Sequence, residues 1–204
     1  MTLNCLLTGV GGQGTVLLSR LIGGAAIERG LDVRGTETIG MAQRGGSVVS
    51  HIRMGERIYS PLIPPGTAEI VIAFEPAEAV RILSFLSESG TMIVLNRAIP
   101  PVTSSLGAPY DPRLMPEYLA ARLGAGGQGA ERREKRLFVI DGEDLIQRCG
   151  SPRVINTALL GAALKRGLFP FDAEDVLRVL ERRIPERFLA LNRRALEIGG
   201  ELAG

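Results

Sequence analysis

Leu3-Asn4-Cys5-Leu6-Leu7-Thr8-Gly9-Val10-Gly11-Gly12-Gln13-Gly14 is the stretch that decides the fold. Its first six residues are almost wholly apolar, which is typical of a strand buried on both faces of a parallel sheet. Thr15–Glu28 then repeats apolar residues at helical spacing, and Gly30 ends the helix. A short strand is expected around Leu31–Arg34. The order strand, glycine turn, helix, strand predicts a Rossmann-like opening unit with a right-handed crossover between parallel strands.

Strands and helices alternate along the rest of the chain. Further strands are predicted over Ser47–Met54, Ile70–Phe74, Thr91–Leu95 and Leu137–Ile140, with a hairpin tip at Gly55-Glu56 leading into Arg57–Tyr59. Helices are predicted over Ala77–Ser87, Pro116–Leu123, Val154–Arg166, Ala173–Arg183 with Asp172 as its cap, and Glu186–Ile198. This alternation predicts one α/β domain over residues 1–204, a three-layer α/β/α fold with a mainly parallel sheet. A flexible surface loop is expected near 124–136.

Composition narrows the class of function. The 204 residues are 45% hydrophobic and 23% charged, as in a globular protein with a substantial core. Aromatic residues make up only 4% and Trp is absent, so a base-stacking surface for nucleic acid is not expected. The net charge of +2 does not indicate a polyanion-binding field. No signal peptide or membrane span is recognisable, which favours the cytoplasm.

Cys5 and Cys149 are the only cysteines in the sequence. Two cysteines supply neither a disulfide framework nor the ligand set of an iron–sulfur cluster or a structural zinc site. We therefore expect no metal centre in this chain.

The glycine turn matches the pattern G-x-G-x-x-G between a strand and a helix. Glycines allow close approach of a ligand, and the free N–H groups of the helix N-terminus attract phosphate. A dinucleotide site also needs a carboxylate at the end of the second strand. Asp32 comes too early in that strand and Glu37 lies past Gly35, so NAD(P) binding is an alternative rather than the first choice. A second alternative is that the glycines serve only close packing of strand and helix and bind no ligand. The candidate phosphate-binding residues are Gly9, Gly11, Gly12, Gln13 and Gly14.

A second distinctive segment runs from Gly35 to Ser47 and is interpreted as a polar loop near the ligand edge of the sheet. Arg44, followed by two glycines, is the best candidate for contact with an anion. The alternative is a surface loop with local hydrogen bonds. The candidate residues facing a cleft or partner are Thr36, Glu37, Thr38, Met41, Gln43, Arg44, Gly45, Gly46 and Ser47.

No residue is an obvious acid, base or nucleophile, so no catalytic residue is assigned. His51 is the only histidine and, within a strand, favours a structural role. Glu75 is expected to complement a helix N-terminus. Asp141 follows a strand and is a further candidate for the ligand edge.

Two motifs together make the sequence recognisable. GVGGQG at Gly9–Gly14 and TETIGMAQRGGSVVSHIRMG at Thr36–Gly55 closely resemble the gamma subunit or domain of 2-oxoacid:ferredoxin oxidoreductases. The likeness continues at Glu75-Pro76 and at Arg153–Gly161. Within this family the chain most resembles the small beta subunit of the enzymes that act on indolepyruvate.

The resemblance implies the fold of domain III of pyruvate:ferredoxin oxidoreductase and a division of labour. A large partner subunit would carry thiamine diphosphate, magnesium and iron–sulfur clusters, ferredoxin would accept the electrons, and coenzyme A would be a co-substrate. This chain would bind none of these cofactors alone. It would complete the active-site cleft and help to receive coenzyme A, would be inactive by itself, and would be able to form a homodimer when isolated. A ligand-free scaffolding subunit is the remaining alternative.

Overall fold

The computed structural model describes residues 2–39, 46–100, 111, 113–124 and 136–203. Six strands form one sheet in the order β2-β3-β1-β4-β5-β6. Their bounds are β1 Thr2–Val10, β2 Asp32–Ile39, β3 Ser47–Gly55, β4 Ala68–Ala73, β5 Leu86–Asn96 and β6 Leu137–Asp141. The neighbouring pairs β1–β4, β4–β5 and β5–β6 are parallel, whereas β3 is antiparallel to both β1 and β2. The predicted mainly parallel α/β sheet is confirmed.

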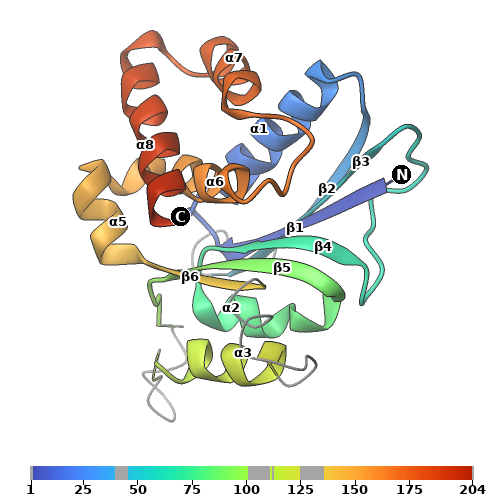
Figure 1. Cartoon of the computed structure of the whole chain (residues 1–204), viewed down its shortest axis with the longest axis vertical. Helices are drawn as coiled ribbons and strands as arrows, with labels where there is room; N and C mark the ends of the chain where they lie inside the picture. The colour runs from blue at the N-terminus through green and yellow to red at the C-terminus, as the bar shows by residue number, and fades with distance from the viewer. Residues whose placement is uncertain (1, 40–45, 101–110, 112, 125–135, 204) are drawn as a thin grey trace.

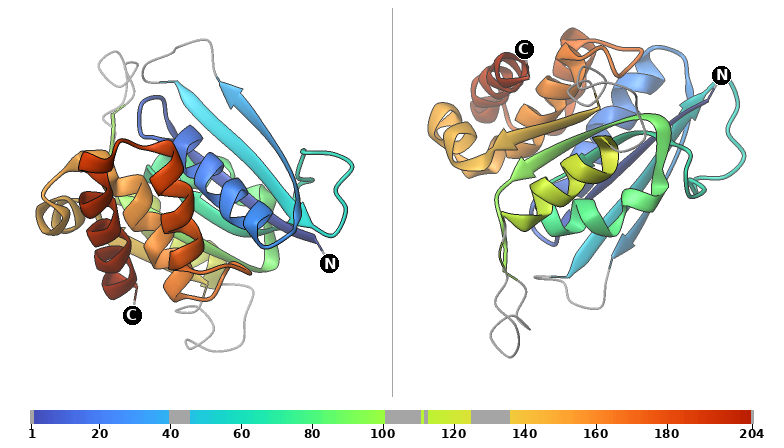
Figure 2. Two further views of the ribbon diagram at one scale, coloured as in Figure 1. Left: turned by 90° about the horizontal axis from the view of Figure 1, so that it is seen from above. Right: turned by 60° about the horizontal axis from the view of Figure 1, so that its bottom comes forward.

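Helices cover both faces of the sheet (Figure 1, Figure 2). One face carries α1 Thr15–Glu28, α5 Gly142–Cys149, α6 Ile155–Lys165, α7 Ala173–Arg183 and α8 Leu189–Leu202. The other face carries α2 Pro76–Arg81 and α3 Leu114–Gly124. Short 3-10 turns lie at Leu83–Phe85, Pro152–Val154 and Glu186–Phe188. Within the described residues, no helix is both long enough and apolar enough to cross a bilayer.

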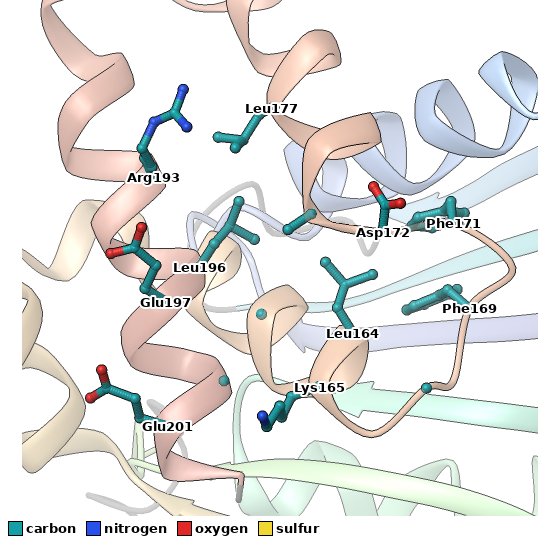
Figure 3. Close-up of a pocket in the computed structure, with 14 residues that line it drawn as sticks. Leu164, Lys165, Phe169, Phe171, Asp172, Leu177, Arg193, Leu196, Glu197 and Glu201 are labelled. Atoms are coloured by element: carbon teal, nitrogen blue, oxygen red, sulfur yellow. The ribbon is translucent and has the colours of Figure 1, made fainter.

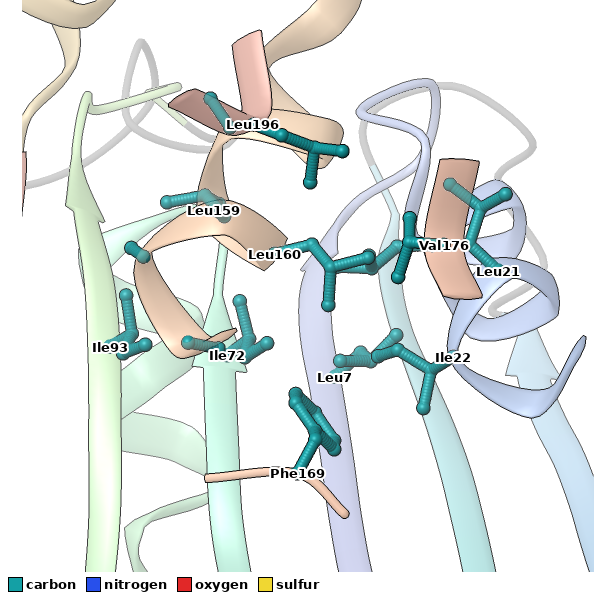
Figure 4. Packing of buried hydrophobic residues seen from close by; sticks show 14 of the residues in the cluster. Leu7, Leu21, Ile22, Ile72, Ile93, Leu159, Leu160, Phe169, Val176 and Leu196 are labelled. Atoms are coloured by element: carbon teal, nitrogen blue, oxygen red, sulfur yellow. The ribbon is translucent and has the colours of Figure 1, made fainter. Parts of the chain in front are cut away.

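The apolar runs of the central strands are buried on both sides, as their sequences predict. Leu7, Ile72 and Ile93 pack beneath α1, α6 and α7 (Figure 4), whereas Leu6 and Val71 pack against α2 and α3. Because successive side chains of a strand point to opposite faces, each run supplies two separate cores.

The opening unit differs from the prediction in one respect. β2 runs parallel to β1, but β3 is inserted between them and pairs with both. The predicted hairpin from Gly55-Glu56 into Arg57–Tyr59 is therefore wrong, because both edges of β3 are already occupied. Pro61, Pro64 and Pro65 also keep the following segment out of a sheet.

Tertiary contacts also place other element boundaries differently from the prediction. The helix predicted to reach Ser87 ends at Arg81, and β5 already begins at Leu86, which pairs with Ala68 in β4. α5 was not predicted; Asp141 Oδ1 accepts hydrogen bonds from the backbone N–H groups of Glu143 and Asp144 and caps it. The predicted α7 and its Asp172 cap are confirmed. The loop expected near 124–136 lies almost wholly outside the described residues.

Candidate phosphate-binding groove

The glycine turn presents backbone N–H groups at the start of α1. Gly12 and Gly14 have φ values of 99° and 86°, conformations that favour glycine. No side chain caps α1 and no acidic residue lies in its first turn. Among the described residues, no acceptor contacts the N–H groups of Gly12, Gly14 or Thr15. Such a helix N-terminus offers free donors and a partial positive charge, which suit an anion.

Not every predicted cradle residue faces a ligand. A Cβ at Gly9 would lie 2.9 Å from the Phe74 Cβ atom and 2.7 Å from Gln13 Oε1, so Gly9 is required for packing. The Gln13 side chain is held by two hydrogen bonds, from the Val10 N–H at 2.7 Å and to the Phe74 carbonyl at 2.9 Å. The backbone N–H of Gln13 is bonded to the Val10 carbonyl at 3.2 Å, and that of Gly11 is also engaged, so the N–H groups of Gly12, Gly14 and Thr15 remain available to a phosphate.

A groove of about 510 Å³ opens beside this turn. One wall is the glycine turn, the second is the end of β5, and the third is the start of α6. Asn156 in the third wall packs so tightly on Gly14 that a Cβ there would lie 3.0 Å from its Nδ2 atom. The groove is lined by Gly11, Gly12, Gln13, Gly14, Leu17, Phe74, Leu95, Arg97, Ile99, Pro152, Arg153, Ile155 and Asn156.

Two arginines on this lining were not predicted as site residues. Arg97 Nε lies 3.3 Å from the exposed carboxylate of Glu143. The exposed Arg153 side chain has no ion-pair partner among the described residues. Arg153 belongs to one of the stretches that carry the family resemblance, which is the signal that would have found it. A cationic wall opposite free N–H groups makes the groove suited to phosphate.

The two predicted motifs meet in space. The Gly11 N–H donates a 2.9 Å hydrogen bond to the Gly46 carbonyl, and Ser47 Oγ lies 2.5 Å from Glu78 Oε2. Gly46 and Ser47 therefore lie beside the glycine turn. Met41, Gln43, Arg44 and Gly45, the remaining predicted residues of this segment, lie outside the described residues.

The first part of the second segment is a strand rather than a loop. Gly35 to Ile39 belongs to β2, where Thr36, Glu37 and Thr38 pair with β3. Hydrogen bonding to β3 imposes the extended backbone despite the glycine and threonines. Glu37 Oε1 lies 3.4 Å from Ser19 Oγ, so its side chain points toward α1.

The remaining polar candidates have structural contacts. His51 is buried, its Nδ1 atom accepts a 3.1 Å hydrogen bond from the Ile63 N–H, and burial lowers the pKa of the imidazole. Glu75 accepts a 3.0 Å hydrogen bond from the Glu78 N–H and caps α2, as expected. Asp141 caps α5 and does not line the groove. Within the described part of the chain, no three His, Cys, Asp and Glu side chains gather as metal ligands would.

The family model described as pyruvate ferredoxin/flavodoxin oxidoreductase matches residues 4–202. The chain belongs to this family. Among its relatives, the indolepyruvate oxidoreductase subunit IorB of Thermococcus kodakarensis is 34% identical over 98% of this chain and 95% of its own length. The protein of the same name from Pyrococcus horikoshii shows the same identity and coverage. The predicted resemblance is confirmed.

Solved structures of other proteins share the fold of this chain. The gamma subunit of a keto/oxoacid ferredoxin oxidoreductase from Geobacter sulfurreducens aligns with a TM-score of 0.67 at 20% identity, covering 98% of both chains. The 2-oxoglutarate:ferredoxin oxidoreductase from Magnetococcus marinus, with 2-oxoglutarate, coenzyme A and succinyl-CoA bound, aligns with a TM-score of 0.68 at 19% identity. That alignment covers 99% of this chain and 31% of the larger one. The fold therefore occurs both as a separate subunit and as one part of a longer chain.

Proposed function

We propose that this chain is the small subunit of a cytoplasmic, thiamine-diphosphate-dependent 2-oxoacid:ferredoxin oxidoreductase, with indolepyruvate as the oxoacid. The observation that carries this proposal is the full-length match, at 34% identity, to relatives named as indolepyruvate oxidoreductase subunits. The match to the Thermococcus kodakarensis protein extends over 98% of this chain and 95% of that relative, so the likeness is not confined to the two motifs.

The residues of this chain do not fit an iron–sulfur cluster. Cys5 lies inside β1 and Cys149 at the end of α5, both are buried, and burial raises the pKa of both thiols. Cluster ligands are thiolates, usually four of them. We therefore assign thiamine diphosphate, magnesium and the clusters to a large partner subunit, which would decarboxylate the oxoacid and pass electrons to ferredoxin.

The groove at the glycine turn is the part of this chain that we assign to coenzyme A. Its volume lies within the range of small-molecule sites. The free N–H groups of Gly12, Gly14 and Thr15 would bind a phosphate of coenzyme A, and Arg97 and Arg153 would neutralise its charge. Gly46 and Ser47 fix one end of the second motif beside this groove, and Arg44 is our candidate for anion contact facing the partner.

The test is an assay with and without the thiamine- and cluster-bearing partner. Reduction of a low-potential dye would be followed with indolepyruvate and other 2-oxoacids, in the presence and absence of coenzyme A. Turnover that requires both chains supports the proposal, and the preferred oxoacid names the substrate. If the chains neither co-purify nor turn over any oxoacid, the proposal is wrong.

Substitution of Arg153 distinguishes a subunit that binds coenzyme A from a ligand-free scaffolding subunit. In the assembled enzyme, Arg153→Ala should raise the KM for coenzyme A by about tenfold, because a charged hydrogen bond to phosphate is lost. The exposed Arg183 on α7 lies outside the groove, so Arg183→Ala is the matched control and should leave this KM unchanged. A normal KM in both variants would remove Arg153 from the site.

A stand-alone NAD(P)-dependent enzyme is the rival function. Asp32 is the first residue of β2, and its carboxylate contacts Arg34 at 2.7 Å and the Ile58 N–H at 2.9 Å. Asp32 is therefore at the wrong end of the strand and already engaged. Saturable binding of NADH by the isolated chain would favour this rival.

A further inference from the structure

A second hollow lies among α6, α7 and α8 and has no counterpart in the sequence motifs (Figure 3). Its volume is about 600 Å³. α6 joins it to the phosphate-binding groove: Ile155 and Asn156 line the groove, whereas Leu164 and Lys165 line the hollow. At 1.5 Å per residue, the ends of α6 lie about 15 Å apart. The hollow is thus a separate site.

The interior of the hollow is apolar. Phe169 and Phe171 stack at one end, with ring centroids 4.8 Å apart and an interplanar angle of 17°. Leu164, Leu177 and Leu196 project between this aromatic end and Arg193 (Figure 3). A concave apolar surface of this size is the usual setting for a small organic ligand.

The hollow exists because α6 and α8 pack with their backbones in contact. A Cβ on Gly161 or Gly199 would overlap the carbonyl of Leu196 or Ala158, respectively. The two helices therefore approach closely along this seam, while α7 stands over α1 on the other side of the hollow. Side chains on the near faces of α6 and α8 then line a space that α7 does not fill.

The carboxylates at the rim already have cationic neighbours. Asp172 Oδ2 lies 2.7 Å from Arg29 Nη2, and Glu201 pairs with Arg148. The Glu197 side chain also lines a neighbouring hollow that contains Arg148 and Arg194. Asp172 and Glu201 are therefore neutralised, whereas Glu197 forms no ion pair with the described residues and leaves one negative charge on the lining.

Two cations remain, at opposite ends of the hollow (Figure 3). The Arg193 side chain extends toward Leu177, and its only ion-pair neighbour among the described residues is Glu181, at 4.0 Å. Lys165 has no ion-pair partner in the described part of the chain. Lys165 and Arg193 therefore outnumber Glu197, the one lining acid without an ion pair among the described residues, and an apolar hollow with this balance of charge favours an apolar anion.

We propose that this hollow binds a monocarboxylate with an aryl-alkyl body. The carboxylate pairs with the Arg193 guanidinium, whose planar fork suits bidentate contact. The alkyl linker lies along Leu177 and Leu196, and the ring reaches Leu164 and the aromatic pair Phe169–Phe171. Lys165 adds positive charge at the other end. An amine would be repelled by both cations, and a short acid would leave the apolar walls in contact with water.

The test is calorimetric titration of the full chain with 3-phenylpropionate. Three matched probes each remove one feature: 3-phenylpropionamide has no charge, phenethylamine has the opposite charge, and propionate has no ring. We expect saturable binding of 3-phenylpropionate only. Absence of binding at millimolar concentration, or equal binding of the amide or the amine, would overturn the proposal.

Adjacent arginines on α8 provide the control variants. Arg193→Gln should weaken binding at least about tenfold, because a charged hydrogen bond is lost. Arg194→Gln changes the next residue, which lines the neighbouring hollow, and should leave the affinity unchanged. Both side chains are exposed, so neither variant should unfold the protein. Equal effects of the two variants would contradict the assignment.

The assembled enzyme decides between a small ligand and a protein segment. We expect the complex to bind 3-phenylpropionate as the isolated chain does. Binding that disappears on assembly would show that a partner segment fills the hollow and would overturn the proposal.

Discussion

The side-chain amide of Gln13 donates a 2.9 Å hydrogen bond to the carbonyl oxygen of Phe74. Through this contact, the glycine turn after β1 is tied to the end of the adjacent parallel strand β4. The same side chain accepts the Val10 N–H at 2.7 Å. The glutamine of the motif thus shapes the turn, and its side chain is not free for a ligand.

Gln13→Ala should destabilise the fold by about 1–3 kcal/mol, because one backbone donor and one backbone acceptor lose their partner. Urea unfolding measures the change in free energy. Gln147 on α5 is exposed, and Gln147→Ala should change the stability by less than about 0.5 kcal/mol. Equal stability of the two variants would show that Gln13 does not brace the turn.

Gly12 tests the proposed contact with phosphate. A Cβ at this position meets no atom within 4 Å, although φ is 99°. Gly12→Ala should therefore cost only about 1–2 kcal/mol in backbone strain, while the added methyl group enters the space assigned to the ligand. We expect a raised KM for coenzyme A in the assembled enzyme at a temperature where the variant is folded. An unchanged KM would place the phosphate elsewhere.

Two consecutive glycines on α8 should respond in opposite directions. A Cβ at Gly199 would overlap the Ala158 carbonyl, whereas a Cβ at Gly200 would have its nearest neighbours at 3.7 Å. Gly199→Ala should destabilise the protein by about 1–3 kcal/mol through overpacking. Gly200→Ala should stabilise it by about 0.5–1 kcal/mol, because alanine favours a helix interior. Thermal unfolding of both variants measures the contrast, and loss of stability in both would contradict the packing described for α6 and α8.

His51 should make stability depend on pH. Burial lowers the pKa of the folded-state imidazole below the ordinary value for histidine, and the Ile63 N–H needs an unprotonated Nδ1 acceptor. Below about pH 6.5 the unfolded chain therefore binds more protons than the folded chain, so stability falls as the pH falls. This contribution is fully present above that pH.

Urea unfolding between about pH 8 and pH 5 measures the effect. His51→Gln should reduce the slope, because no other histidine is present in the sequence. Identical slopes for the wild type and His51→Gln would show that the buried imidazole does not carry the dependence.

Local patterns predicted the elements whose causes are local. The apolar run of β1, the Asp172 cap of α7 and the Glu75 cap of α2 each depend on neighbouring residues, and all are confirmed. The position of β3 was not predictable in this way. Alternation within Ser47–Met54 indicates a strand, but the choice of β1 and β2 as its neighbours depends on distant residues.

The groove, too, could be predicted from the sequence only in part. Glycine spacing predicted the turn, because a turn is encoded by consecutive residues. Arg97 and Arg153 come from separate parts of the chain. They reach the groove only because the last residue of β5 and the first residue of α6 lie at the same edge of the sheet. Their contribution therefore depends on tertiary packing, which a single sequence does not display.

The central place of β1 has a consequence for folding during synthesis. β1 precedes both of its partners in the chain, since β3 ends at Gly55 and β4 at Ala73. Its apolar residues Cys5, Leu6 and Leu7, each 0% exposed in the fold, remain unpaired until both partners have been made. Such an unpaired apolar strand is prone to aggregation and is a natural target for chaperones. We therefore expect the yield of folded chain to rise when synthesis is slowed or chaperones are supplied, while the stability of the folded protein stays the same.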